Sequence, residues 1–231
     1  METKKTKNVS VSKKNIIFAV DFKNDNLDIE KKKGILTRTL DLFSKRGIKS
    51  CTMGEICAFQ RISKKTLYKY FKDKDDLVES CMSFELERTE TAVKDIMSKG
   101  LNAIDESFEI SRFVIDNVSD LHPALFFELE NFYPQAFKLY EEHQNKSIRT
   151  SIYDNLEKGI KEGLYRSDLN IEIVVSIYLT ILYNLLSARM INTKSFSFRD
   201  IYRELFIYHT HGISSPKGLE YLQTKLKSNE Q

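Results

Sequence analysis

Apolar residues recur at a helical period along most of this chain. A first helix is predicted from about Asp28 to Gly47, a glycine placed to end it, and its apolar face is formed by Ile35, Leu36, Thr39, Leu42 and Phe43. Residues 1–27 lack a comparable pattern beyond a short apolar run at 16–20. We expect this segment to be a flexible, basic N-terminal arm.

Two short helices are predicted after Gly47, and each has its own N-terminal cap. Thr52 and Glu55 form a T-x-x-E capping box, which predicts a helix over roughly 53–59. Ser63 offers the second cap, and the residues after it divide into two faces on a helical period. The apolar face holds Leu67, Tyr70 and Phe71, and the basic face holds Lys65, Tyr68, Lys69 and Lys72.

The rest of the chain is also predicted to be helical. Asp73 caps a helix that runs to about Ser98, and further helices are expected near 102–118, 121–130, 134–163, 169–191 and 198–212. Pro123 and Pro134 suit first turns, and Gly163 suits a helix end. Residues 216–231 are expected to be a loose helical tail. The predicted fold class is therefore all-α.

Composition favours the same fold class and narrows the environment. Only eight Gly and three Pro leave few chain breakers in 231 residues. Cys51, Cys57 and Cys81 are odd in number and lack CxxC spacing, so neither a disulfide framework nor a zinc site is expected, and a reducing cytoplasm fits. The uncharged stretch 173–188 is too short for a membrane span and is interrupted by polar residues.

The formal charge is distributed unevenly. Residues 1–72 hold 18 Lys/Arg and 7 Asp/Glu, a net charge of +11, whereas residues 73–231 hold 18 and 26, a net charge of −8. A basic module favours a polyanionic partner. Solvated lysines in the arm are the alternative explanation, but residues 15–72 alone still carry +7, from 13 basic and 6 acidic residues.

The two capped helices within 51–72 have the spacing of a helix-turn-helix. In this motif the first helix braces against the DNA backbone and the second enters the major groove, where lysine reaches guanine acceptors and hydroxyls bind phosphate. A solvated amphipathic face is the alternative for the lysines considered alone. The capping box, the second cap and the turn spacing together favour DNA binding.

The same segment resembles the N-terminal domain of the TetR family of transcription regulators. The resemblance covers about 28–88 and rests on Ile35-x₃-Thr39-x₂-Leu42-Phe43-x₃-Gly47, Thr52-x₃-Ile56 and Ile62-Ser63-x₂-Thr66-Leu67-Tyr68-x-Tyr70-Phe71-x₂-Lys74-x₂-Leu77. It implies that phosphates are held by Thr52, Thr66, Tyr68, Tyr70 and Lys74, and that Lys64, Lys65 and Lys69 are placed toward bases. For Tyr70 the helical period leaves a core role equally open.

Some residues depart from the family pattern. Cys57, Phe59 and Gln60 replace small residues of the second helix, and Arg61 replaces the usual turn glycine. Glycine permits positive φ, which costs another residue roughly 1 kcal/mol or more. Gly54 offers no side chain on the exposed side of the second helix, so base readout should depend mainly on the third. The departures leave open a helical ligand-binding or interaction protein that has lost DNA binding.

For residues 89–231 the resemblance implies a helical domain with an effector chamber and a two-fold dimer interface. The helix at 169–191 is apolar on nearly all sides, as expected if a partner covers it, and the interface residues expected are Ile173, Ile177, Ile181, Asn184 and Leu185. Aromatic density suits a mostly apolar pocket, although core packing is the plainer interpretation of any single ring. The candidate ligand residues are Phe108, Phe126, Phe127, Tyr133 and Phe137.

These observations indicate a sequence-specific, DNA-binding transcription regulator. We expect a repressor that binds palindromic, double-stranded operator DNA as a homodimer and is released by a small-molecule effector. An enzyme is not expected, because the sequence contains no Gly-rich phosphate loop, G-x-S-x-G elbow or Cys/His catalytic setting. The four histidines form no HExxH motif or i, i+4 pair, so neither a metal nor another cofactor is expected.

Overall fold

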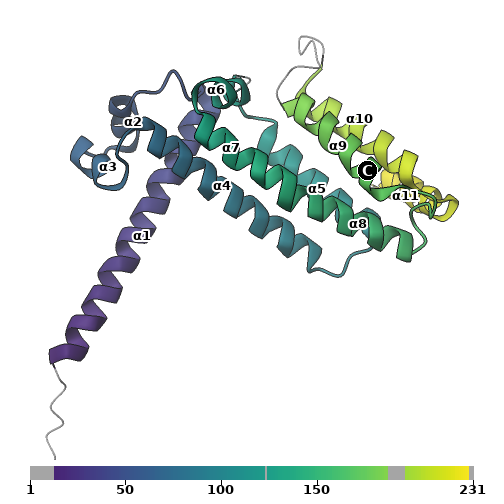
Figure 1. Ribbon diagram of the computed structural model, residues 1–231, viewed down its shortest axis with the longest axis horizontal. Coiled ribbons are helices and arrows are strands. Elements are labelled where there is room, and N and C mark those ends of the chain that lie inside the picture. The colour runs from purple at the N-terminus through teal and green to yellow at the C-terminus, as the bar shows by residue number, and fades with distance from the viewer. Residues whose placement is uncertain (1–12, 123, 187–195, 229–231) are drawn as a thin grey trace, which may run out of the picture.

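The chain folds into helices almost throughout (Figure 1). A computed structural model describes residues 13–122, 124–186 and 196–228, and within these ranges there is no β-strand. The all-α fold class predicted from the hydrophobic pattern is thus confirmed.

The N-terminal part contains α1 (Lys13–Arg46), α2 (Met53–Gln60) and α3 (Lys64–Tyr70). The expected start of the first helix near Asp28 was wrong, because α1 begins at Lys13 and its N-terminal half projects away from the other helices (Figure 1). No Gly or Pro between 13 and 33 interrupts this extension. Residues 1–12 of the expected arm lie outside the described residues.

The middle of the chain folds back on itself along α4 (Lys74–Met97). The next helices are α5 (Ala103–Val118), α6 (Leu125–Phe132), α7 (Pro134–His143) and α8 (Arg149–Lys161). A π-helical turn, η1 (Gln144–Ile148), joins α7 to α8 within the single helix expected at 134–163. The helix expected at 121–130 lies slightly later in the chain, and Pro123 lies outside the described residues.

The last helices are α9 (Ile171–Leu186), α10 (Phe198–Ile213) and α11 (Pro216–Ser228). They lie at the opposite end of the molecule from α2 and α3 (Figure 1). Residues 187–191 of the helix predicted at 169–191 lie outside the described residues. The expectation of a loose tail was wrong, because Leu222 of α11 is fully buried and the Tyr221 hydroxyl donates to Asp105 Oδ2 at 2.6 Å.

Two main cores hold these helices together. The first joins α1, α2, α3 and the start of α4, and it continues into Leu129 of α6 and Ala136 of α7. All three cysteines, Cys51, Cys57 and Cys81, are buried in it. The second core lies among α5, α8, α9, α10 and α11. The helix-turn-helix therefore shares its apolar core with α6 and α7, and any movement of these two helices must repack it.

Candidate nucleic-acid interface

The first helix of the motif starts and ends at defined backbone caps. The capping box is formed as predicted: Glu55 N–H donates to the Thr52 hydroxyl at 3.2 Å, and Thr52 N–H donates to the Glu55 carboxylate at 2.7 Å. At the other end Arg61 has φ 54° and ψ 41°, the left-handed conformation expected at the family's glycine position. The turn geometry is therefore kept although the residue is not glycine.

Gln60 and Cys57, two of the departures from the family pattern, are absorbed into the core. The Gln60 amide donates to the Thr39 hydroxyl at 2.8 Å and to the Ile35 carbonyl at 3.3 Å, which ties α2 to α1. Phe59, in contrast, remains 44% exposed on α2. Gln60 therefore stabilises the position of α2 against α1, since its buried amide is hydrogen-bonded.

The second helix, α3, presents the two faces that its sequence predicts. Ser63 caps it, because the Thr66 N–H donates to the Ser63 hydroxyl at 3.0 Å. Leu67 is fully buried, and Phe71, just after the helix, is 1% exposed. The exposed residues of α3 include Lys64, Lys65, Tyr68 and Lys69. Four candidate DNA-binding residues thus share a solvent-facing surface on α3.

Asp28 of α1 bonds to two of the candidate DNA ligands. Lys69 Nζ donates to its carboxylate at 2.6 Å, and the Tyr70 hydroxyl donates to it at 2.9 Å. These hydrogen bonds hold the pKa of Asp28 below its ordinary value. The ring of Tyr70 packs on the first core, as the core role predicts, and its hydroxyl bonds Asp28 at the surface, so its phosphate role stays a prediction. Sequence spacing did not reveal this contact.

Lys74 lies at the start of α4 and faces the loop between α1 and α2. Its ammonium donates to the Ile48 carbonyl at 2.8 Å and lies 3.4 Å from the Lys49 carbonyl. Burial lowers the pKa of Lys74. Its expected phosphate contact stays a prediction, and in the free protein this ammonium holds the loop.

Glu128 of α6 reaches the same loop from the helical domain. Its carboxylate accepts the N–H of Ile48 at 2.6 Å and of Lys49 at 3.0 Å. Gly47 permits this approach, because it has φ +76° and a Cβ there would lie 3.0 Å from a Glu128 carboxylate oxygen. Glu128 was not singled out by the sequence, in which it is one acid among many.

The expected ligand residues do not form one site. Phe126 and Phe137 pack around buried Tyr140, with ring centroids 5.2 and 6.1 Å away. Tyr133 and Phe137 contact the first core, whereas Phe127 is 56% exposed. Phe108 of α5 instead packs against Phe206 of α10, with ring centroids 4.8 Å apart. The expectation of a single chamber lined by all five was wrong, since core packing uses most of these rings.

The expected dimer residues of α9 differ in their exposure. Ile173 and Ile177 are 56% and 54% exposed, but Leu185 is only 7% exposed and packs in its own subunit. Ile181 and Asn184 are half-buried. Leu185 was wrongly assigned to the interface, because helical rotation turns it away from Ile173 and Ile177.

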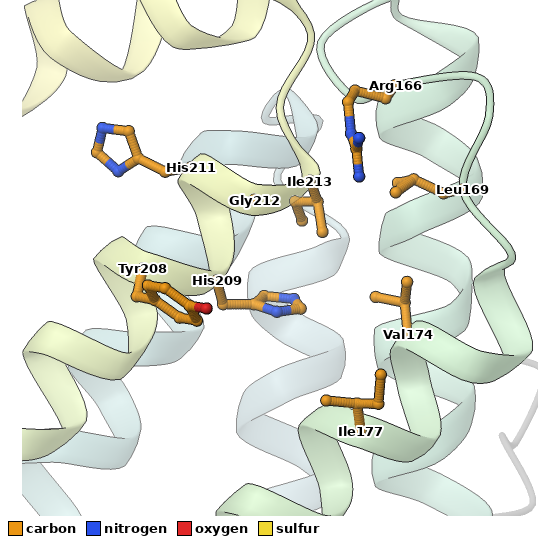
Figure 2. Close-up of a pocket in the computed structure, with 9 residues that line it drawn as sticks. All are labelled: Arg166, Leu169, Val174, Ile177, Tyr208, His209, His211, Gly212 and Ile213. Atoms are coloured by element: carbon orange, nitrogen blue, oxygen red, sulfur yellow. The ribbon is translucent and has the colours of Figure 1, made fainter.

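A cleft of about 460 Å³ adjoins the exposed side of α9. Figure 2 shows the His209 ring extending from α10 toward Val174 of α9, with Tyr208 and Ile177 nearby. Tyr208 is 77% exposed, and burial lowers the pKa of His209 to about 4. The α9–α10 side therefore exposes large apolar and aromatic side chains.

Within 13–122, 124–186 and 196–228, no three His, Cys, Asp or Glu residues gather as a metal site. No described helix has the length and apolar character needed to cross a membrane.

Comparisons with known proteins agree with this geometry. Residues 35–81 match the model of the bacterial regulatory proteins of the tetR family. The HTH-type transcriptional repressor KstR2 of Mycobacterium tuberculosis is 24% identical over 136 residues, which cover 58% of this chain and 68% of KstR2.

Solved structures share the fold. Reduced NemR of E. coli has a TM-score of 0.66 at 13% identity, covering 80% of this chain and 97% of its own. The transcriptional regulator FadR of Bacillus subtilis, in complex with stearoyl-CoA, has a TM-score of 0.60 at 15% identity, covering 78% and 97%.

Proposed function

We propose that the chain is a repressor of the TetR family of bacterial helix-turn-helix regulators and that it binds a palindromic operator as a homodimer. The observation that carries the proposal is the exposed face of α3, where Lys64, Lys65, Tyr68 and Lys69 lie on a helix that is fixed by the Ser63 cap and a buried core. A rigid element of this kind is what groove recognition requires.

The roles of the individual residues follow from their positions. Lys64, Lys65 and Lys69 are the proposed base-reading residues, since they lie on α3 and are exposed. Thr52, Thr66, Tyr68, Tyr70 and Lys74 are the proposed phosphate ligands. The Thr52 hydroxyl already donates its proton to the Glu55 carboxylate, and the Thr66 hydroxyl shares a hydrogen bond with the Ser63 hydroxyl in which either can donate. A hydroxyl needs its proton to donate to a phosphate oxygen. Tyr68 is therefore the strongest phosphate candidate among them.

The palindromic operator follows from a proposed dimer that forms through α9 and α10. The exposed side of α9, with Ile173 and Ile177, adjoins exposed Tyr208 of α10, and apolar surface of this kind favours an isologous contact. A two-fold dimer presents two α3 helices to successive major grooves, so the half-sites should lie about one helical turn apart or somewhat more.

Control by a small molecule is part of the proposal. A regulator of the same fold, FadR of Bacillus subtilis, is described in complex with stearoyl-CoA. In this chain, Glu128 joins α6 to the loop before α2, which gives the helical domain a contact through which occupancy can alter the DNA-binding part.

Fluorescence anisotropy across a salt series tests the proposal, with the DNA upstream of the chain's own gene and a scrambled duplex. We expect Lys65→Ala to cost roughly 1–3 kcal/mol on the operator and little on scrambled DNA, because a base contact specifies sequence. Tyr68→Phe should weaken binding to both duplexes similarly, since a phosphate contact carries no sequence information. Equal binding by wild type and a folded variant that lacks Lys65, Tyr68 and Lys69 would show that α3 does not read DNA.

A further inference from the structure

A second cleft, of about 490 Å³, lies between α5, α10 and α11. Its floor is apolar: Phe108 and Phe206 meet edge to face with ring centroids 4.8 Å apart, and Leu226 of α11 lies beside them. The volume falls within the range of small-molecule sites, roughly 300–1,000 Å³. The floor thus suits an apolar chain or ring system.

The rim of this cleft is basic. Arg112, Arg199, Arg203 and Lys225 line it, and Glu109 is its one acidic lining residue. The surrounding sequence has the opposite sign, because residues 73–231 contain 18 basic and 26 acidic residues. A cluster of arginines above an apolar floor is therefore a local feature of the cleft.

Three of these cations have acidic partners close by. Arg112 lies 2.8 Å from Glu109, Arg199 lies 3.6 Å from Asp116, and Lys225 lies 2.9 Å from Asp105.

Arg203 differs from them. It is exposed, and it forms no close ion pair with any residue that the structure describes, although its charge acts on the carboxylate of Asp200 one helical turn before it. An anion can reach its guanidinium without breaking an existing pair, and a guanidinium binds carboxylate or phosphate through two parallel hydrogen bonds. An exposed pair such as Arg199–Asp116 contributes little stability, so the Arg199 side chain can leave Asp116 and turn toward the anion.

We propose that this cleft binds an amphipathic anion, with an acyl chain on Phe108, Phe206 and Leu226 and the anionic head group on Arg203 and its basic neighbours. The inference deepens the proposed function, on which it rests, by assigning the effector class and its site. Helix α5 also packs against α4, whose first residue, Lys74, holds the loop before α2. A ligand in the cleft can therefore affect the DNA-binding part through α5, α4 and the loop that Lys74 holds.

Titration calorimetry with three matched probes tests the binding step, each kept below its micelle concentration. The probes are palmitate, palmitoyl-CoA and the neutral alcohol hexadecanol. We expect one or both anions to bind wild type about tenfold or more tightly than hexadecanol, because only the anions form a charged hydrogen bond with Arg203. Binding of palmitate identifies a carboxylate head, and binding of palmitoyl-CoA alone identifies a phosphate head. No binding of either anion, or equal binding of hexadecanol, overturns the proposal.

Arg203→Gln and Arg203→Glu test the site, with Lys227→Glu as the matched control. Lys227 is exposed on α11 and two residues from Lys225, so helical rotation places it away from the cleft. Both Arg203 variants should weaken anion binding about tenfold or more, whereas Lys227→Glu should change it less than about twofold. Unchanged binding by folded Arg203→Glu overturns the assignment.

DNA anisotropy separates this inference from the proposed function. Without a probe, Arg203→Glu should bind the operator as wild type does, since the cleft is remote from α3. A saturating anion should release wild type and leave the variant bound. If wild type does not bind DNA even without a probe, the proposed function is contradicted. If it binds DNA and no probe alters that binding, only the effector assignment is contradicted.

Discussion

The carboxylate of Glu128 accepts the backbone N–H of Ile48 at 2.6 Å, across the boundary between the helical domain and the DNA-binding part. Lys74 binds the carbonyl of the same residue at 2.8 Å. One residue of the loop between α1 and α2 is therefore held by an acid from α6 and a base from α4. We expect substitutions at these contacts to affect both stability and the coupling between the two parts of the chain.

Glu128→Ala should lower the free energy of unfolding by roughly 1.5–3 kcal/mol. The reason is that hydrogen bonds to a charged group contribute about this much, and the part-buried Ile48 N–H and the exposed Lys49 N–H both lose their acceptor. Urea denaturation followed by circular dichroism measures the change. Glu141→Ala, on exposed α7 surface, is the control and should stay within about 0.5 kcal/mol of wild type. Equal stability of the two variants would contradict the role of the loop contact.

Arg61→Gly should raise the free energy of unfolding by about 1 kcal/mol, because glycine adopts the left-handed conformation at φ 54° without the Cβ penalty. Ala58→Gly is the matched control in the exposed interior of α2, where glycine should cost about 1 kcal/mol. Thermal and urea unfolding of both variants provide the comparison. A loss of stability in Arg61→Gly would mean that the arginine side chain outweighs the backbone penalty.

Asp28→Asn should strengthen DNA binding on operator and scrambled duplexes alike. The substitution removes a negative charge 2.6 Å from Lys69, so the ammonium is no longer neutralised near the phosphates. The gain should be largest at low salt and smaller at high salt, because added ions screen exposed charges. Anisotropy across a salt series measures it, with Asp41→Asn, a partner of Lys45 on the same helix, as control. Weaker binding would show that Asp28 instead positions Lys69 for the groove.

Ile177→Asp and Leu185→Asp should fail in different ways. Ile177 is 54% exposed, so its substitution should dissociate the dimer and leave a folded subunit. Leu185 is 7% exposed, so a charge there should unfold the chain or cost several kcal/mol. Sedimentation velocity and circular dichroism distinguish the two outcomes. A stable wild-type monomer at micromolar concentration would contradict dimerisation through α9.

Stability should fall as the solution is acidified from about pH 6.5 to pH 4. His209 has a pKa of about 4 when folded and 6.5 as the ordinary value, so over this window the unfolded chain binds a proton that the folded chain does not. The loss should approach about 3 kcal/mol. His209→Gln should flatten the curve measured by urea denaturation, whereas His211→Gln, at an exposed position on the same helix, should not. A parallel curve for His209→Gln would contradict this assignment.

The sequence predicted the motif well because its signals are local. The Thr52–Glu55 box, the Ser63 cap and the apolar positions of α3 each lie within one or two helical turns, and all were confirmed. Tertiary contacts were not predictable in this way. Asp28 meets Tyr70 across 42 positions, and Glu128 meets Ile48 across 80, so no periodicity connects them.

The helical domain shows the same limit. Aromatic density in α6 and α7 predicted a pocket, but those rings fill the space around Tyr140 themselves. The basic rim between α5, α10 and α11 brings together residues from three separate segments, which spacing along the chain could not associate.

The three buried cysteines provide a way to measure how often the core of the DNA-binding part opens. Cys51, Cys57 and Cys81 are 1%, 5% and 2% exposed, and burial raises the pKa of the Cys57 and Cys81 thiols. An alkylating reagent reacts with an exposed thiolate, so each label can be attached only while the surrounding core is open. The labelling rate of each cysteine then reports how often its own part of the core opens. Operator DNA, if it binds only the closed form, should slow all three rates together.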